Sequence, residues 1–143
     1  MERSAKMILE TVKHFMKEVG WGFLATSDGN KVGVRPMGSC VWIGSELWAA
    51  TRVGSEKIAQ LRKVPHAEYC FSDKEGKHVR IAGTCSVSTN NDDKLKLYQA
   101  VPALKNYYKD PSVPEYVVIR MKPRSIRWMA GVGKGYEDIE VPK

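Results

Sequence analysis

The stretch Leu47–Phe71, LWAATRVGSEKIAQLRKVPHAEYCF, decides how this chain folds. It has the pattern of an apolar strand, a turn, a short amphipathic helix that ends at Pro65, and a second strand. Thr51, Ser55 and Lys57 gather around the predicted start of that helix, where free backbone N–H groups and the helix dipole favour a bound phosphate. The alternative is that Ser55 is only a helix cap and Lys57 only a surface lysine.

The remaining elements are predicted to be mainly β. Apolar residues at helical spacing indicate a first helix over about residues 5–19, which stops at Gly20. Two hairpins follow: GFLAT with KVGVRPM, and CVWI with ELWAAT across Gly44 and Ser45. After the short helix, AEYCFS pairs with HVRIAGTCSVS, and a further helix begins near Asn90 and ends at Pro102.

The C-terminal part supplies the last strands. YVVIRMKPRSIRWM predicts one or two strands with a break at Pro123, and a loosely ordered tail is expected from about residue 130. Six or so antiparallel strands with a few helices indicate a single domain over residues 1–143. We therefore expect a small closed or split β-barrel of Greek-key type.

Composition limits the classes of function. The chain has 143 residues and a net charge of +7, but basic and acidic residues are interleaved, which favours phosphate-bearing ligands over a long nucleic-acid groove. No apolar run is long enough to span a bilayer, and the N-terminus lacks the apolar core of a signal peptide, so no membrane association and a cytoplasmic location are expected. Cys40, Cys70 and Cys85 have no metal-ligand spacing and are expected to be reduced thiols, without a metal.

Taken with Leu24-Ala25-Thr26 and Val34-Arg35-Pro36-Met37, the order of elements from about Met7 to Trp128 resembles the pyridoxamine 5′-phosphate oxidase-like family of FMN-binding split barrels. The resemblance implies a homodimer with two FMN molecules at the subunit interface. It also implies an oxidoreductase in which the flavin accepts hydride from a reduced electron donor and passes it to a small-molecule substrate or to oxygen.

The resemblance also implies a set of cofactor-binding residues. Arg35 and the T-x3-S-x-K residues Thr51, Ser55 and Lys57 would bind the FMN phosphate, whereas Pro36, Met37, Gly38 and Ala50 would meet the ring. His78, in a strand similar to the family's Q-V-R-x-x-G, and Trp128 would lie at the flavin or the dimer seam. Solvent-exposed Arg35 and His78 and a core Trp128 are the alternatives. Oxidase members often carry a second basic residue where this chain has Glu56, and no catalytic side chain is assigned.

Several functions stay open at this point. Relatives that oxidise pyridoxamine phosphate have an R-x-H-type substrate motif near the C-terminus, which MAGVGKGYEDIEVPK lacks, so a reductase or a flavin-binding protein with another substrate is favoured. A stress-related flavin-binding protein without turnover and a basic β-barrel that binds nucleic acid are the alternatives. Deazaflavin and haem are also open as cofactors.

Overall fold

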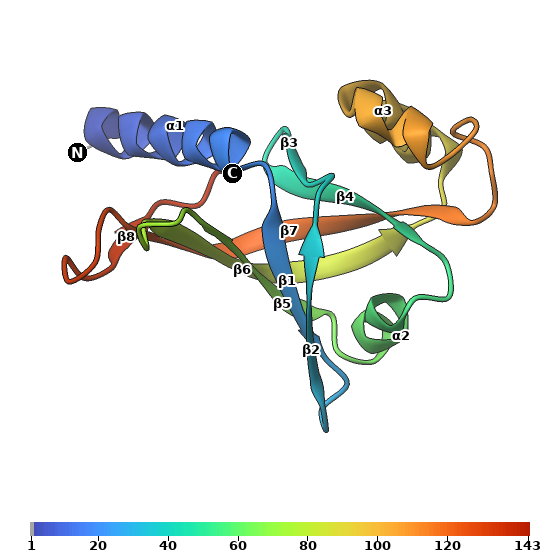
Figure 1. Cartoon of the computed structure of the whole chain (residues 1–143), viewed down its shortest axis with the longest axis horizontal. Helices are drawn as coiled ribbons and strands as arrows, with labels where there is room; N and C mark the ends of the chain where they lie inside the picture. Colours follow the sequence, from blue (N-terminus) through green and yellow to red (C-terminus); the bar gives the residue numbers. More distant parts are fainter. Residues whose placement is uncertain (1) are drawn as a thin grey trace.

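The computed structural model describes the backbone of residues 2–143 and the side chains of residues 8–143. It contains three α-helices, a short 3-10 helix and eight strands within this range (Figure 1). In chain order they are α1 (Glu2–Val19), β1 (Gly22–Ser27), β2 (Val32–Met37), β3 (Val41–Ile43), β4 (Glu46–Arg52), α2 (Glu56–Lys63), β5 (His66–Ser72), β6 (His78–Ser88), α3 (Asn91–Ala100), η1 (Pro102–Asn106), β7 (Tyr116–Met129) and β8 (Glu137–Ile139).

Helix α1 confirms the first predicted element, although it begins slightly earlier than expected. Its apolar stripe buries Val12, Phe15 and Met16 against the sheet. The helix ends at Gly20, which has a φ of 80° and donates its N–H to the Met16 carbonyl at 2.9 Å. Glycine adopts this left-handed conformation without steric cost, which explains the sharp stop. No helix within residues 2–143 is both long and apolar enough to cross a membrane.

The strands form one antiparallel sheet in the order β2-β1-β5-β6-β7-β4-β3, and β8 pairs with β7. Within the described residues, the end strands β2 and β3 do not pair with each other, so the sheet stays open. The prediction of a mainly β, antiparallel split barrel is therefore confirmed. Both predicted hairpins, β1–β2 and β3–β4, are present.

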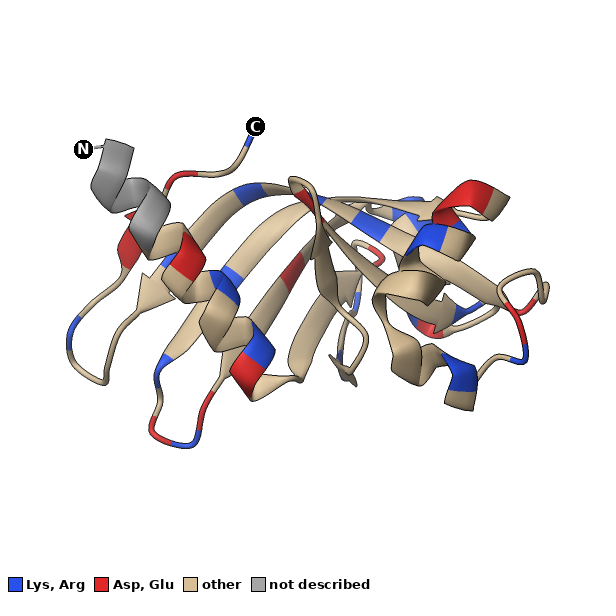
Figure 2. Cartoon of the chain, turned by 90° about the horizontal axis from the view of Figure 1, so that it is seen from above, with Lys and Arg blue, Asp and Glu red and all other residues tan. Residues whose placement is uncertain are grey.

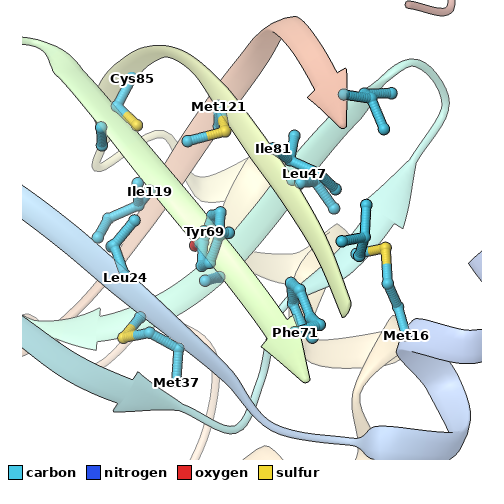
Figure 3. Packing of buried hydrophobic residues seen from close by; sticks show 14 of the residues in the cluster. Met16, Leu24, Met37, Leu47, Tyr69, Phe71, Ile81, Cys85, Ile119 and Met121 are labelled. Carbon is cyan, nitrogen blue, oxygen red and sulfur yellow. The ribbon is translucent and has the colours of Figure 1, made fainter. Parts of the chain in front are cut away.

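The main hydrophobic core joins residues of α1 and α2 to residues of strands far apart in the sequence (Figure 3). Leu24, Leu47, Tyr69, Ile81 and Met121 are all fully buried there. Burying a large apolar side chain of this kind stabilises a fold by about 1.5–3 kcal/mol. A second cluster, formed mainly by aromatic residues, lies under α3 and η1. The two cores pack on opposite faces of β4, with Leu47 and Ala49 in the first and Trp48 in the second, and so hold the strand whose C-terminal end lines the site.

The C-terminal segment differs from the prediction. In place of a loosely ordered tail from about residue 130, β8 pairs with β7 and buries Ile139 in the main core, opposite Ile126. Likewise, β7 runs through Pro123 as one strand. A register shift between Ala82 and Gly83 of β6 accommodates this position, since a bulge tolerates the missing proline N–H.

Candidate functional site

A cavity of about 670 Å³ opens where the end of β2, the end of β4, the start of α2 and the η1 segment meet. Ligand pockets in proteins usually measure about 300–1,000 Å³, so this one has the size of a cofactor site. Most of its lining is apolar, with a few polar groups at the α2 end. The lining residues are Trp21, Pro36, Met37, Gly38, Ser39, Ala50, Thr51, Arg52, Ser55, Lys57, Val101, Ala103, Leu104, Tyr107 and Tyr108.

Three predicted phosphate ligands meet at the start of α2. Thr51 lies near the end of β4, Ser55 is the N-cap residue of α2, and Lys57 lies in the first turn of that helix. The Lys57 Nζ donates a hydrogen bond to the Thr51 Oγ1 at 2.7 Å. All three residues line the cavity, so the end of β4 and the start of α2 contribute two hydroxyl-bearing residues and one lysine to the same wall.

Ser55 occupies the N-cap position without acting as a cap. Its backbone is extended, as an N-cap requires, but its side chain makes no capping hydrogen bond. The Ser55 Oγ is buried and has no hydrogen-bond partner among the described residues. Leaving a buried hydroxyl unpaired costs about 1–3 kcal/mol. The predicted start of the helix at Ser55 is therefore correct, and the Ser55 hydroxyl is free to bond with a ligand.

The donors at this place fit a phosphate group. The first helical bonds of α2 are those that the Ile58 and Ala59 N–H groups donate to the Ser55 carbonyl at 3.1 and 3.3 Å, so the N–H groups of Glu56 and Lys57 precede them, and the helix dipole makes this end partially positive. Phosphate oxygens accept hydrogen bonds from backbone N–H, hydroxyl and ammonium groups, all of which are present. The unpaired Ser55 Oγ is the group that a phosphate would satisfy.

The charge on Lys57 is held in an unfavourable environment. Burial lowers the pKa of the Lys57 ammonium, and the nearby positive charge of Arg35 lowers it further. Thr51 offers only a neutral hydroxyl as partner. An anion bound in the cavity would favour the charged form and so raise this pKa again. The site is therefore electrostatically suited to an anion.

Arg35 lies beside the cavity rather than in its wall. Its Nη1 donates to the Leu24 carbonyl at 3.1 Å and to the Thr26 Oγ1 at 2.6 Å, and its Nη2 lies 3.6 Å from the Glu56 Oε1. The described lining residues do not include Arg35. Direct contact of Arg35 with a phosphate stays a prediction, while its charge already acts on Lys57.

The predicted ring-binding residues gather at the other part of the cavity. Pro36, Met37, Gly38 and Ala50 all belong to its lining. A Cβ atom at Gly38 would lie 2.9 Å from the ring of Trp21, so a larger residue at this position would require that exposed ring to shift. The contact of these four predicted residues with a flavin ring stays a prediction.

His78 and Trp128 lie away from this cavity in the single chain. The His78 Nε2 is 2.7 Å from the Tyr136 hydroxyl, at the start of β6. Trp128 is buried in the core, where its ring meets that of Phe15 edge-on with centroids 5.2 Å apart. Neither residue lines the cavity, and their proposed contacts with flavin or at a dimer seam stay predictions.

The sequence did not predict the residues that form one wall of the cavity. The segment around η1 contributes Leu104, Tyr107 and Tyr108, and Arg52 at the end of β4 lies with its guanidinium carbon 5.3 Å from the centre of the Tyr108 ring. The helix end at Pro102 was visible in the sequence. Where the chain goes after it depends on tertiary packing against β4 and β7, which no local pattern encodes.

Comparison with known proteins supports the resemblance. A family model described as pyridoxamine 5'-phosphate oxidase matches residues 8–130, whereas no curated protein matches the chain. Among solved structures, a NimC/NimA family protein from Clostridium acetobutylicum is similar at 24% identity and a TM-score of 0.78, covering 96% of this chain and 92% of that chain.

Two further solved structures are similar at lower identity. A protein related to general stress protein 26 from Clostridium acetobutylicum has a TM-score of 0.80 at 13% identity, covering 96% of both chains. A pyridoxamine 5'-phosphate oxidase-related, FMN-binding protein from Nostoc punctiforme has a TM-score of 0.70 at 16% identity, covering 92% of this chain and 86% of that chain. At these identities the structures share the fold, while the family match spans most of the sequence. The chain therefore belongs to the pyridoxamine 5'-phosphate oxidase family.

Proposed function

We propose that this chain is a cytoplasmic, FMN-binding oxidoreductase that holds the flavin phosphate at the start of α2. The family match and the FMN-binding relative from Nostoc punctiforme support flavin as the cofactor class. The observation that carries the proposal is the buried Ser55 Oγ, which has no partner among the described residues and lies beside Lys57 in the cavity wall. A phosphate is the ligand group that matches these donors.

The side chains of this protein bind and orient the cofactor. Thr51, Ser55 and Lys57 would anchor the phosphate, and the end of β2 with Gly38 would flank the ring together with Ala50. The apolar part of the wall, including Leu104, would shield the bound ring from water. When bound, the isoalloxazine supplies the hydride or electron transfer itself, between a reduced donor and a small-molecule acceptor.

The proposed homodimer is supported by an apolar surface on the β1–β2 hairpin. Phe23 is 49% exposed, Val34 70% and Val32 83%, although these are large apolar side chains. In the strand register, Phe23 pairs with Pro36, and Val34 pairs with Ala25, which places them on one face of the hairpin. Contiguous exposed apolar surface of this kind is typical of an interface, and a second copy of the chain would cover it.

A flavin-binding protein without turnover is the second candidate. The described lining residues include no histidine, cysteine, aspartate or glutamate that could move a proton. The structural similarity to a protein related to general stress protein 26 fits this alternative. Binding of nucleic acid has less support, because Lys and Arg are interspersed with Asp and Glu over helices, strands and loops (Figure 2). Proteins that bind single-stranded nucleic acid use a continuous basic groove.

The proposal is tested by visible absorption and flavin titration. The purified protein should either carry a flavin spectrum or bind added FMN with saturation, and released ligand should be identified as FMN. Anaerobic mixing with nicotinamide donors then separates the two candidates, since only an oxidoreductase should bleach the flavin. A protein that does not bind FMN would refute the cofactor assignment, and binding of deazaflavin or haem instead would identify the group that replaces it.

A further inference from the structure

The charges around Lys57 leave an FMN phosphate incompletely neutralised. A phosphate monoester carries a charge of about −1.5 to −2 near pH 7. Lys57 supplies one positive charge. Arg35 does not line the cavity, its Nη2 lies 3.6 Å from the carboxylate of Glu56, and its Nη1 donates to the Leu24 carbonyl. A second cation in the cavity wall would complete the neutralisation of this charge.

Arg52 is placed to be that cation. Among the described lining residues, Lys57 and Arg52 are the two with a positive charge. Arg52 lies at the exposed end of β4, next to Thr51, and its guanidinium carbon lies 5.3 Å from the centre of the Tyr108 ring. No ion pair recorded between described residues involves Arg52, so an acidic side chain does not offset its charge.

We propose that Arg52 is the second cation that binds the FMN phosphate. Position 56, next to Lys57, is a glutamate and supplies no positive charge. This inference rests on the proposed function. A guanidinium presents a planar set of N–H donors that matches phosphate oxygens, and its contact with the face of Tyr108 limits the orientations of that plane. Arg52 thus acts on the phosphate alone and makes the site prefer FMN over riboflavin.

The test compares the two flavins, which differ only in the phosphate. Dissociation constants for FMN and riboflavin are measured by quenching of flavin fluorescence for the wild-type protein and for Arg52→Gln, Arg52→Lys and Arg62→Gln. Arg62 is the matched control, because it is an exposed arginine in the last turn of α2 and does not line the cavity. Arg52→Gln should weaken FMN binding about tenfold, equal to about 1.4 kcal/mol.

Riboflavin binding should stay unchanged in Arg52→Gln, Arg52→Lys should retain most of the FMN affinity, and Arg62→Gln should match the wild type. Circular dichroism and thermal unfolding confirm that each variant is folded. An Arg52→Gln variant that loses affinity for both flavins equally, or for neither, would overturn the role of Arg52, while FMN binding by the wild-type protein would still support the proposed function. A wild-type protein that binds neither flavin would instead overturn the proposed function, and with it this inference.

Discussion

Replacing Ser55 with alanine is expected to stabilise the unliganded protein and to weaken FMN binding. In the structure, the Ser55 Oγ is buried without a partner among the described residues and makes no capping bond to α2. The substitution removes a desolvated hydroxyl and should raise the free energy of unfolding by about 1 kcal/mol. For a chain of this size, that corresponds to an increase of about 3 °C in the melting temperature.

The effect on FMN has the opposite sign. A hydrogen bond to a charged group contributes about 1.5–3 kcal/mol. Loss of the Ser55 bond to the phosphate should therefore raise the dissociation constant for FMN roughly tenfold to a hundredfold. Riboflavin binding should be unaffected, because riboflavin has no phosphate.

Thermal unfolding without ligand and flavin titration measure the two effects. Asn90→Ala is the control, because Asn90 does cap α3, accepting from the N–H groups of Asp92 and Asp93 at 2.8 and 3.1 Å. That variant should lose about 1 kcal/mol of stability and keep its FMN affinity. If Ser55→Ala instead behaves like Asn90→Ala, Ser55 is an ordinary cap and the phosphate-site argument is wrong.

Three other predictions address charge, assembly and thiol chemistry. Burial lowers the pKa of Lys57, and a bound phosphate favours the charged form of its ammonium group. FMN affinity should therefore be highest below the lowered pKa and should fall as the pH rises through it toward 10.5, the ordinary lysine value. The Lys57→Arg variant should not show this fall. Val34→Glu, on the exposed face of β2, should convert a dimer into a folded monomer in light scattering, and an unchanged mass would contradict the proposed interface. Iodoacetamide should label half-buried Cys70 before Cys85, whose pKa burial raises to about 12, and peptide mass spectrometry showing the reverse order would contradict the described packing.

Features encoded by neighbouring residues were predictable from the sequence. Asn90 caps α3 through N–H groups two and three residues later, and Gly44 permits the β3–β4 turn with a φ of 61°. The start of α2 is set in the same local way, by the turn before Ser55 and the first-turn Glu56. Each of these caps and turns depends on only a few neighbouring residues, so composition and spacing were enough to predict where they lie.

Contacts between distant segments were not predictable in the same way. The pairing of Arg35 with Glu56 joins β2 to α2, and the stacking of Arg52 on Tyr108 joins β4 to the end of η1. Strand β8 was missed because Ile139 is a single apolar anchor after a glycine-rich segment, too short to show a period of two. In each case tertiary packing, rather than local propensity, determines which residue or strand the segment contacts.

A crystal structure of the protein with bound FMN would show whether the phosphate binds at the start of α2. We expect the flavin in the cavity between β4, α2 and η1, with phosphate oxygens within hydrogen-bonding distance of the Ser55 Oγ and the Lys57 Nζ. A flavin whose phosphate lies elsewhere, with Ser55 still unpaired, would contradict it.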